Sequence, residues 1–333
     1  MPPGPAATPP GRTKVMYIAG TGRSGSTLVV QILDRVPGAV GVGEVRYLWD
    51  RGILQNRLCG CGKPFSDCPV WTTILDEAFG GAGGVDAKAA MADQQARTRL
   101  RRVPGLLWAS RRRSPGGDSA HAGRLGRLYP AIAAATASAV VVDSSKLPTY
   151  GWLLGQVPEI DLYVVHLVRD PRAAAYSWTR RKPLPDVGAD AVMATQGLVR
   201  SSVLWTVWNL TAERFWAHHT ERYLRIRYED LVAAPRHAID QMLALVGLDG
   251  PEGAAGSVFL DDQTTELGVT HSVAGNPDRL KQGPVSIRAD NRWQACMSGF
   301  RQAVVTALAL PRLARYHYPL RPAHAGSAPD GKG

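Results

Sequence analysis

A glycine-rich segment near the N-terminus combines residue types that bind anionic groups. It runs from Gly20 to Thr27, after the short apolar run at residues 15 to 19 and before an apolar helix pattern at residues 28 to 35. A strand, a glycine loop and a helix in that order present backbone N–H groups and the positive end of a helix dipole to one anion. The segment therefore predicts a phosphate-binding loop.

The loop departs from the P-loop of nucleoside triphosphate enzymes at one position. Gly20, Gly25 and Thr27 fit the G-x-x-x-x-G-K-[ST] frame, but Ser26 stands where that frame requires lysine. Arg23 supplies a cation inside the loop instead, and its planar guanidinium suits a terminal anionic group. The missing lysine argues against a P-loop kinase or nucleotide hydrolase. We keep that class of enzyme as the alternative function.

A second cation follows another predicted strand, at residues 162 to 168. Arg169 comes first, then Asp170 suits a helix N-cap and Pro171 suits the first helical position. A helix should therefore begin here, and Ser177 lies two turns along it. We expect Arg169 and Ser177 to face a second anion.

Together, the two segments resemble the PAPS-dependent sulfotransferases, whose donor is 3'-phosphoadenosine-5'-phosphosulfate (PAPS). The resemblance covers roughly residues 14 to 318. It is closest to the bacterial, carbohydrate-type and tyrosyl-protein-type branch, because Arg23 stands where phenol-type enzymes have lysine. It implies that Arg169 and Ser177 bind the 3'-phosphate. It also implies that the 5'-phosphosulfate is bound by the loop residues Gly22, Arg23, Ser24, Gly25, Ser26 and Thr27.

The resemblance further implies a general base and a cation for the leaving group. Glu44 matches the glutamate that acts as the base in the similar carbohydrate and tyrosyl-protein enzymes. Lys146 follows a predicted strand at residues 140 to 143 and would neutralise charge on the bridging oxygen, with Arg23 assisting. In-line sulfuryl transfer relies on positioning and charge stabilisation, so the scheme requires no metal and we assign no metal ligands.

A polar, glycine-rich stretch at about residues 271 to 293 precedes the last predicted helix. Long loops of this kind usually bind a ligand or close over it. The resemblance implies that a late arginine binds the 3'-phosphate. Arg279 and Arg288 are both candidates, and the sequence does not choose between them.

Three cysteines lie close together in the sequence, at Cys59, Cys61 and Cys68. They offer a structural zinc ion three soft ligands, and Cys296 or His121 could supply the fourth if folding brings one of them close. A disulfide from Cys68 to Cys59 or Cys61 is a second interpretation. Free thiols in a packed segment are a third, and all three stay open.

The elements that position these residues alternate between apolar segments and helix patterns. Buried strands are predicted at residues 15 to 19, 140 to 143, 162 to 168 and 223 to 228, and later helices at residues 189 to 219, 235 to 246 and 293 to 310. This alternation is typical of a parallel sheet that is covered on both faces, with a ligand beyond the carboxyl ends of the strands. We therefore expect an α/β fold, a P-loop-like three-layer α/β/α arrangement with a central parallel sheet.

The 333 residues are expected to hold one large domain. We place this single sulfotransferase domain at residues 14 to 318, with a mobile basic loop at about residues 110 to 123. A disordered arm at residues 1 to 13 precedes it and a flexible tail at residues 319 to 333 follows. No apolar run is long enough to cross a bilayer and no signal peptide is visible, so we expect a cytoplasmic protein.

The net charge of +11 bears on the partners. A basic surface could attract nucleic acid, anionic lipid or a polyanionic small molecule. The arginines between residues 99 and 113 come without a nucleic-acid motif or an aromatic platform, so we expect no nucleic-acid partner. The predicted function is sulfuryl transfer from PAPS to a hydroxyl of a carbohydrate, lipid-linked or natural-product acceptor, with peripheral contact to an anionic or membrane-linked acceptor as an option. The oligomeric state stays open.

Overall fold

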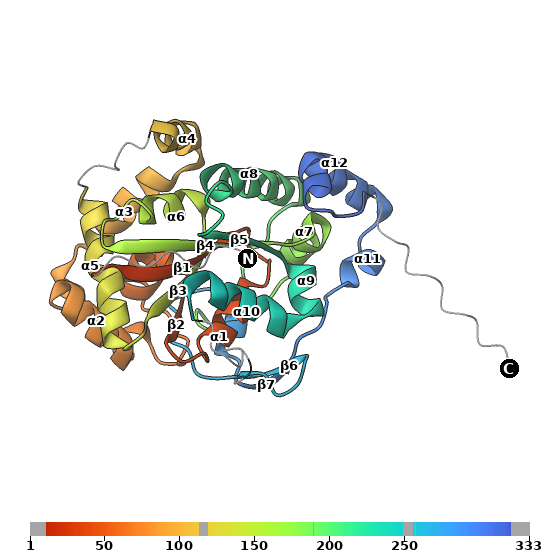
Figure 1. Cartoon of the computed structure of the whole chain (residues 1–333). Coiled ribbons are helices and arrows are strands. Elements are labelled where there is room, and N and C mark those ends of the chain that lie inside the picture. Colours follow the sequence, from red (N-terminus) through yellow and green to blue (C-terminus); the bar gives the residue numbers. More distant parts are fainter. Residues whose placement is uncertain (1–10, 113–118, 189, 249–255, 257, 321–333) are drawn as a thin grey trace.

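Five parallel strands form a central sheet in the order β2-β3-β1-β4-β5. The computed structural model describes residues 11–112, 119–188, 190–248, 256 and 258–320. The strands are β1 (Thr13–Gly20), β2 (Ala39–Gly43), β3 (Val140–Lys146), β4 (Ile160–Val168) and β5 (Tyr223–Arg227). Helices lie above and below this sheet (Figure 1), which confirms the predicted three-layer α/β/α fold.

The central strand β1 shows why the sheet is covered on both faces. Every residue from Val15 to Gly20 is buried, and alternate side chains enter different cores. Val15 and Tyr17 enter the core shared with α5 (Ala120–Ala135), α6 (Pro148–Leu154) and α8 (Leu198–Trp216). Met16 and Ile18 enter the core shared with α1 (Ser26–Leu33) and α10 (Pro235–Val246). A continuous apolar strand is the sequence pattern that this arrangement requires.

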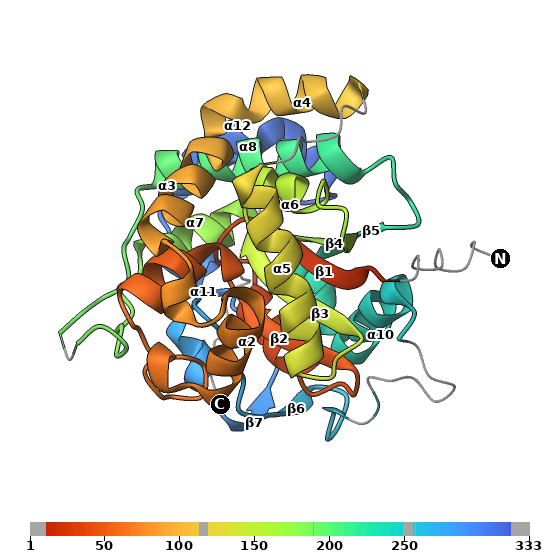
Figure 2. The ribbon, with the colours of Figure 1, turned by 90° about the vertical axis from the view of Figure 1, so that its left-hand side faces the viewer.

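Further helices extend both layers. In Figure 2, α5 crosses the front of the sheet, with α2 and α3 beside it. No helix in the described ranges is long and apolar enough to span a membrane. The additional helices are α2 (Pro69–Phe79), α3 (Ala87–Thr98), α4 (Val103–Arg112), α7 (Pro171–Thr179), α9 (Tyr228–Ala233), α11 (Arg292–Cys296) and α12 (Gly299–Arg315).

Some predicted helix boundaries are confirmed and others are wrong. The helix at residues 235 to 246 is confirmed, with Gly247 in the left-handed conformation after its end. The long helix expected from residue 189 begins only at Leu198, after an irregular segment that contains an isolated bridge between Pro183 and Val192. The last predicted helix is two helices, α11 and α12, because Met297 between them is extended.

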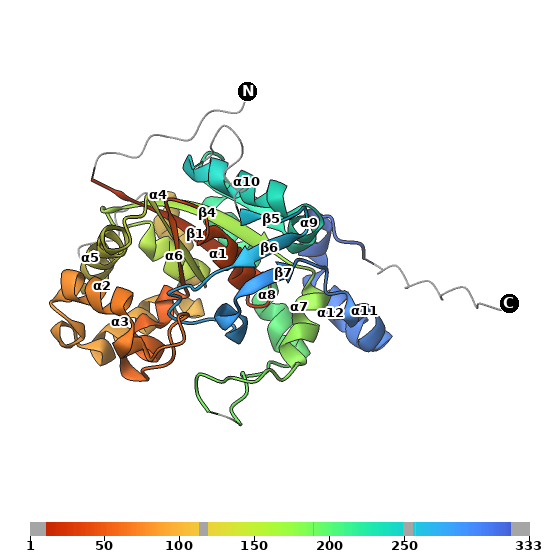
Figure 3. The same ribbon diagram turned by 90° about the horizontal axis from the view of Figure 1, so that it is seen from below.

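Three strands have no counterpart in the prediction. β2 is short and contains two glycines, so neither its length nor its composition indicates a strand. β6 (Thr264–Leu267) and β7 (Gly283–Ser286) form an antiparallel pair, and β7 lies within the late polar stretch. Seen from below in Figure 3, this pair lies across α1 and therefore beside the loop that follows β1.

The segments expected to be mobile are only partly described. The predicted basic loop is helical at both ends, in α4 up to Arg112 and in α5 from Ala120, and residues 113–118 lie outside the described residues. Residue 13, placed in the N-terminal arm, begins β1. Residues 1–10 and 321–333 also lie outside the described ranges, so the domain limits stay a prediction.

The register of the sheet brings the candidate residues to one edge. Ala19 is paired with Lys146, Gly20 with Leu167, and Gly43 with Asp143. The loop after β1, the residue after β2, the end of β3 and the residue after β4 therefore meet at the carboxyl edge. This is where open parallel sheets bind their ligands.

Candidate functional site

Two glycines in the loop after β1 lie against aromatic rings. A Cβ on Gly22 would lie 2.5 Å from the ring of Trp178, and one on Gly25 would lie 2.7 Å from the ring of Tyr228. Gly25 also has a φ of 91° and precedes α1 without a side-chain cap. The first N–H groups of α1 therefore have no capping side chain and can bind an anion.

Arg23 presents unsatisfied hydrogen-bond donors in this loop. Its guanidinium carbon lies 4.8 Å from the ring centre of Trp178, and Nη1 lies 3.6 Å from the sulfur of Met193. Nε and Nη2 are buried and have no hydrogen-bond partner among the described residues. Burial lowers the pKa of Arg23, although the Asp278 carboxylate acts in the opposite direction. An anion at this place would satisfy the free donors and offset the burial of the charge.

Glu44 and Lys146 form a buried ion pair beside the loop. Nζ of Lys146 lies 2.8 Å from Oε1 of Glu44, and the two residues are only 6% and 8% exposed. The same Nζ donates hydrogen bonds to the carbonyl of Ser144 at 2.9 Å and to Oγ of Ser26 at 3.3 Å. Lys146 thus joins the end of β3 to the first residue of α1.

The charges around Glu44 keep it ionised. Burial by itself raises the pKa of a carboxyl group, but Lys146 and Arg46 outweigh this effect and lower the pKa of Glu44 below its ordinary value. Nη2 of Arg46 lies 3.8 Å from the second carboxylate oxygen. Burial also lowers the pKa of Lys146, and the nearby Glu44 opposes that shift. A carboxylate that is charged at neutral pH can accept a proton.

Arg169 lies behind the loop. Its Nη1 donates a hydrogen bond of 3.0 Å to the carbonyl of Arg23, and its guanidinium carbon is 4.4 Å from the ring centre of Tyr228. Oδ2 of Asp290 lies 3.9 Å from Nη2 of Arg169 and 3.9 Å from Nη1 of Arg180, so one carboxylate pairs with two arginines. Nε of Arg169 is buried and has no partner within the described residues. Ser177 is half-buried on α7.

The structure separates the two late arginines. Arg279 is buried and donates hydrogen bonds to Asp186 at 2.8 Å and to the carbonyl of Leu58 at 2.9 Å. Arg288 is exposed and donates to Oγ of Ser286 at 3.1 Å. Neither of them lines the cavity that contains Glu44.

That cavity has a volume of about 390 Å³ and opens at the carboxyl edge of the sheet. It brings together seven of the predicted site residues: Gly22, Arg23, Gly25, Ser26, Thr27, Glu44 and Lys146. Ser24, Arg169 and Ser177 do not line it, and Ser24 is buried with its hydroxyl bonded to the carbonyl of Thr21. Predicted anion-binding and acid–base residues therefore share one chamber.

The sequence singled out no individual residue in the rest of the lining. Much of it is aromatic or apolar: Tyr47, Trp178, Met193, Leu204, Trp205 and Trp208. Ser201, Trp205 and Trp208 follow one another at four and three residues, which places them on one face of α8, and this spacing was the available signal. Nε1 of Trp208 is buried without a hydrogen-bond partner in the described structure. It can donate to a bound ligand.

Asp143 on β3 is the kind of carboxylate by which a P-loop kinase would hold magnesium. It accepts hydrogen bonds from Oη of Tyr129 at 2.6 Å and from the backbone and hydroxyl of Ser145 at 2.7 and 2.6 Å. Burial raises the pKa of Asp143 to about 6. It does not line the cavity, and its hydrogen bonds to Ser145 stabilise the end of β3.

The three clustered cysteines meet a residue that the sequence analysis did not pair with them. One ligand atom from each of Cys59, Cys61, Cys68 and His271 lies within 4.8 Å of all the others. The candidates Cys296 and His121 are both wrong as the fourth member. Cys296 is exposed on α11, and His121 packs against Tyr150 with ring centres 6.3 Å apart.

The chain is similar to known proteins over most of its length. The sulfotransferase domain family model matches residues 13–257. The sulfotransferase domain from the Synechococcus PCC 7002 olefin synthase is 19% identical with a TM-score of 0.52, covering 94% of this chain and 98% of that one. The sulfotransferase domain from the curacin biosynthetic pathway is 17% identical with a TM-score of 0.55, covering 93% and 99%. These two structures share the fold, and no curated protein matches the chain.

Proposed function

This chain belongs to the sulfotransferase domain family, and we propose that it transfers a sulfuryl group from PAPS to a hydroxyl group of a small-molecule or glycan acceptor. The observation that carries the proposal is one cavity that holds both unsatisfied Arg23 donors and the buried Glu44–Lys146 pair. A single chamber can thus bind an anionic donor and take a proton from an acceptor.

The donor would bind along the loop and α1. The N–H groups at the start of α1, with Arg23, suit the 5'-phosphosulfate, because they combine free donors with positive charge. Arg169 and Arg180 both lie 3.9 Å from the carboxylate of Asp290, which supports an anion site in this region. We assign the 3'-phosphate to Arg169 and Ser177, with Arg169 joined to the loop through the carbonyl of Arg23.

The transfer needs one proton acceptor and one stabiliser of the leaving group. Glu44 takes the proton of the acceptor hydroxyl while that oxygen bonds to sulfur. The bond between sulfur and the bridging oxygen breaks in the same displacement, and adenosine 3',5'-bisphosphate leaves with the additional negative charge. Lys146 and Arg23 offset that charge. Lys146 also keeps Glu44 ionised, since its charge opposes the effect of burial.

The acceptor would bind against the aromatic side of the cavity. Trp205 and Trp208 on α8, together with Tyr47, give an apolar wall, and the free N–H of Trp208 gives one polar contact. Arg46 and Arg51 both lie over the ring of Tyr47, at 4.2 and 3.7 Å from its centre. A natural product or sugar with an apolar face and a hydroxyl fits this lining, and the arginines would also suit an anionic substituent.

Ligand binding tests the donor first. Adenosine 3',5'-bisphosphate should raise the melting temperature of the protein, because it binds the folded state, and Arg169→Ala should reduce the rise. ATP with magnesium is the comparison. If ATP with magnesium raises the melting temperature and the bisphosphate does not, the kinase alternative replaces the sulfotransferase proposal.

The base is tested in Glu44→Gln. This variant should keep the bisphosphate-induced rise in melting temperature and lose transfer from radiolabelled donor in an acceptor screen by at least about 100-fold, the usual range for a general base. Glu221→Gln, an exposed site, is the matched control and should keep wild-type transfer. Undiminished transfer in Glu44→Gln would remove Glu44 as the base.

A further inference from the structure

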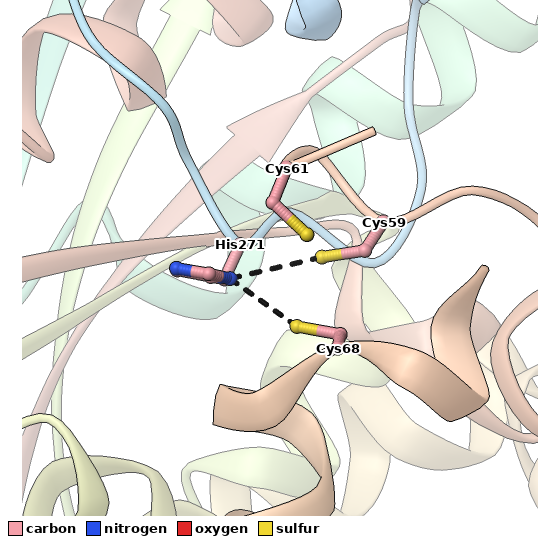
Figure 4. A group of neighbouring side chains, drawn as sticks. All are labelled: Cys59, Cys61, Cys68 and His271. Carbon is pink, nitrogen blue, oxygen red and sulfur yellow. Dashed lines mark hydrogen bonds between the residues drawn. The ribbon is translucent and has the colours of Figure 1, made fainter. Parts of the chain in front are cut away.

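We propose that Cys59, Cys61, Cys68 and His271 bind a structural zinc ion. The three sulfur atoms and Nδ1 of His271 point toward a common centre (Figure 4), with Nδ1 3.2 Å from Sγ of Cys68 and 4.0 Å from Sγ of Cys59. Every pair of the four ligand atoms is within 4.8 Å. Ligand atoms of a tetrahedral zinc site lie about 3.5–3.8 Å apart, given bonds of about 2.0–2.3 Å, so small shifts would complete it.

The chemistry of the four ligands favours zinc over other metals. Three thiolates and one imidazole form a soft set that suits zinc, whereas magnesium and calcium prefer oxygen. The set is complete with four protein ligands, so no position is left for water or substrate. Cys59 and Cys68 are buried, and Cys61 and His271 are half-buried. A closed and largely buried site of this kind is structural rather than catalytic.

The local backbone already holds the cysteines in place. Residues 59 to 62 form a turn in which the N–H of Gly62 donates to the carbonyl of Cys59 at 2.9 Å, and Gly62 has a φ of 84° that favours glycine. An isolated bridge between Leu58 and Pro64 closes this turn. Cys68 is the N-cap residue of α2, where the helix dipole favours a thiolate.

His271 brings a distant segment to this turn. The N–H of Gly60 donates to the carbonyl of Ser272 at 2.9 Å, and Nε1 of Trp71 donates to the carbonyl of His271 at 2.6 Å. A Cβ on Gly60 would lie 2.5 Å from Oγ1 of Thr270, so the two segments pack without spare room. The proposed zinc ion would link two distant segments through metal coordination, since Cys68 and His271 are 203 residues apart in the sequence.

The linked segment continues into the wall of the catalytic cavity. The N–H of Val273 donates to the carbonyl of Val42 at 3.0 Å, and the N–H of Glu44 donates to the carbonyl of Ala274 at 3.3 Å. Gly275 and Asn276 follow directly and line the cavity. The zinc ion would therefore hold the late segment against the residue proposed as the base, although the metal site itself stands whether or not PAPS is the donor.

Metal analysis of the full-length protein, purified without chelators, is the first test. We expect zinc in equimolar amount, and cobalt substitution should give the intense thiolate–cobalt absorption of a tetrahedral site. Cys68→Ser and His271→Ala should each lower the zinc content, while Cys296→Ser, at the exposed cysteine, should leave it unchanged. If either variant fails to fold, cobalt substitution of the wild-type protein decides.

Amide hydrogen exchange tests what the metal holds together. Removal of zinc should speed exchange at residues 58 to 72 and 270 to 276, lower the melting temperature by several degrees, and leave β1 protected. Zinc content far below equimolar with four titratable thiols would overturn the proposal. A disulfide found among Cys59, Cys61 and Cys68 in the purified protein would overturn it as well.

Discussion

At the scale of single residues, the cavity is organised by charges that compensate one another. Glu44 is buried yet ionised because Lys146 lies 2.8 Å away, and Glu44 in turn opposes the lowering of the Lys146 pKa by burial. Arg23 has no such partner for Nε and Nη2 among the described residues. The site thus holds one balanced pair and one cation with free donors, an arrangement suited to an incoming anion.

The pair gives a prediction about pH. In Lys146→Met only Arg46 and Arg51 still oppose burial, so the pKa of Glu44 rises, because an opposite charge at this distance lowers a carboxyl pKa by roughly 1–3 units. The base must be ionised to work, so the acid limb of the kcat/KM profile should move to higher pH by roughly that amount. Lys88→Met, at an exposed lysine of α3, should leave the limb in place. A limb that stays unmoved in Lys146→Met would contradict the coupling.

At the scale of elements, the sequence predicted the parts that obey simple local rules. The start of α7 at Pro171 was predicted from capping chemistry and is confirmed. The loop after β1 was predicted from its motif, but α1 begins at Ser26, two residues earlier than expected. β2 was not predicted, because a five-residue strand with two glycines has no strand-like composition. The face of α8 that lines the cavity was not predicted as part of the site, because its apolar side chains look like ordinary core residues.

The loop also gives a prediction about its geometry. In Gly22→Ala the new Cβ would meet the Trp178 ring at 2.5 Å, so the loop or the indole must move. We expect the affinity for adenosine 3',5'-bisphosphate, measured by calorimetry, to fall about tenfold or more, which corresponds to about 1.4 kcal/mol. Gly123→Ala, in α5 with open space at its Cβ, should keep the affinity and stabilise the helix by about 0.5–1 kcal/mol. Equal affinity in the two variants would show that the close approach is unimportant.

At the scale of the whole molecule, a buried polar contact joins the central sheet to the helix layer that contains α8. His166 on β4 is fully buried, with Nε2 2.8 Å from Oδ1 of Asn209 on α8 and Nδ1 2.7 Å from Oη of Tyr223 on β5. Burial lowers the pKa of His166 to about 4. The folded protein therefore holds a neutral imidazole between sheet and helix layer where the unfolded chain would bind a proton.

The buried His166 makes the folded protein less stable at acidic pH. Between pH values of about 6.5 and 4, the unfolded chain binds a proton at His166 and the folded protein does not, so stability falls as the pH falls. His166→Gln removes this dependence. Over that pH range the free energy of unfolding, measured with urea, should fall by up to about 3 kcal/mol more in the wild type than in the variant. His237→Gln, at an exposed histidine, should show the wild-type slope. Identical slopes in all three proteins would rule out the contribution of His166.

The sequence by itself determined the layered fold and the glycine loop after β1, because glycines, caps and apolar strands act over a few neighbouring residues. Glu44 and Lys146 became candidates through the resemblance to a family. Only the tertiary structure decided which distant side chains meet. It joined His271 to the three cysteines and placed Trp208 on the cavity wall. It also bound Arg279 to Asp186 outside the cavity. These outcomes depend on strand order and on the path of the late segment, which no local pattern encodes.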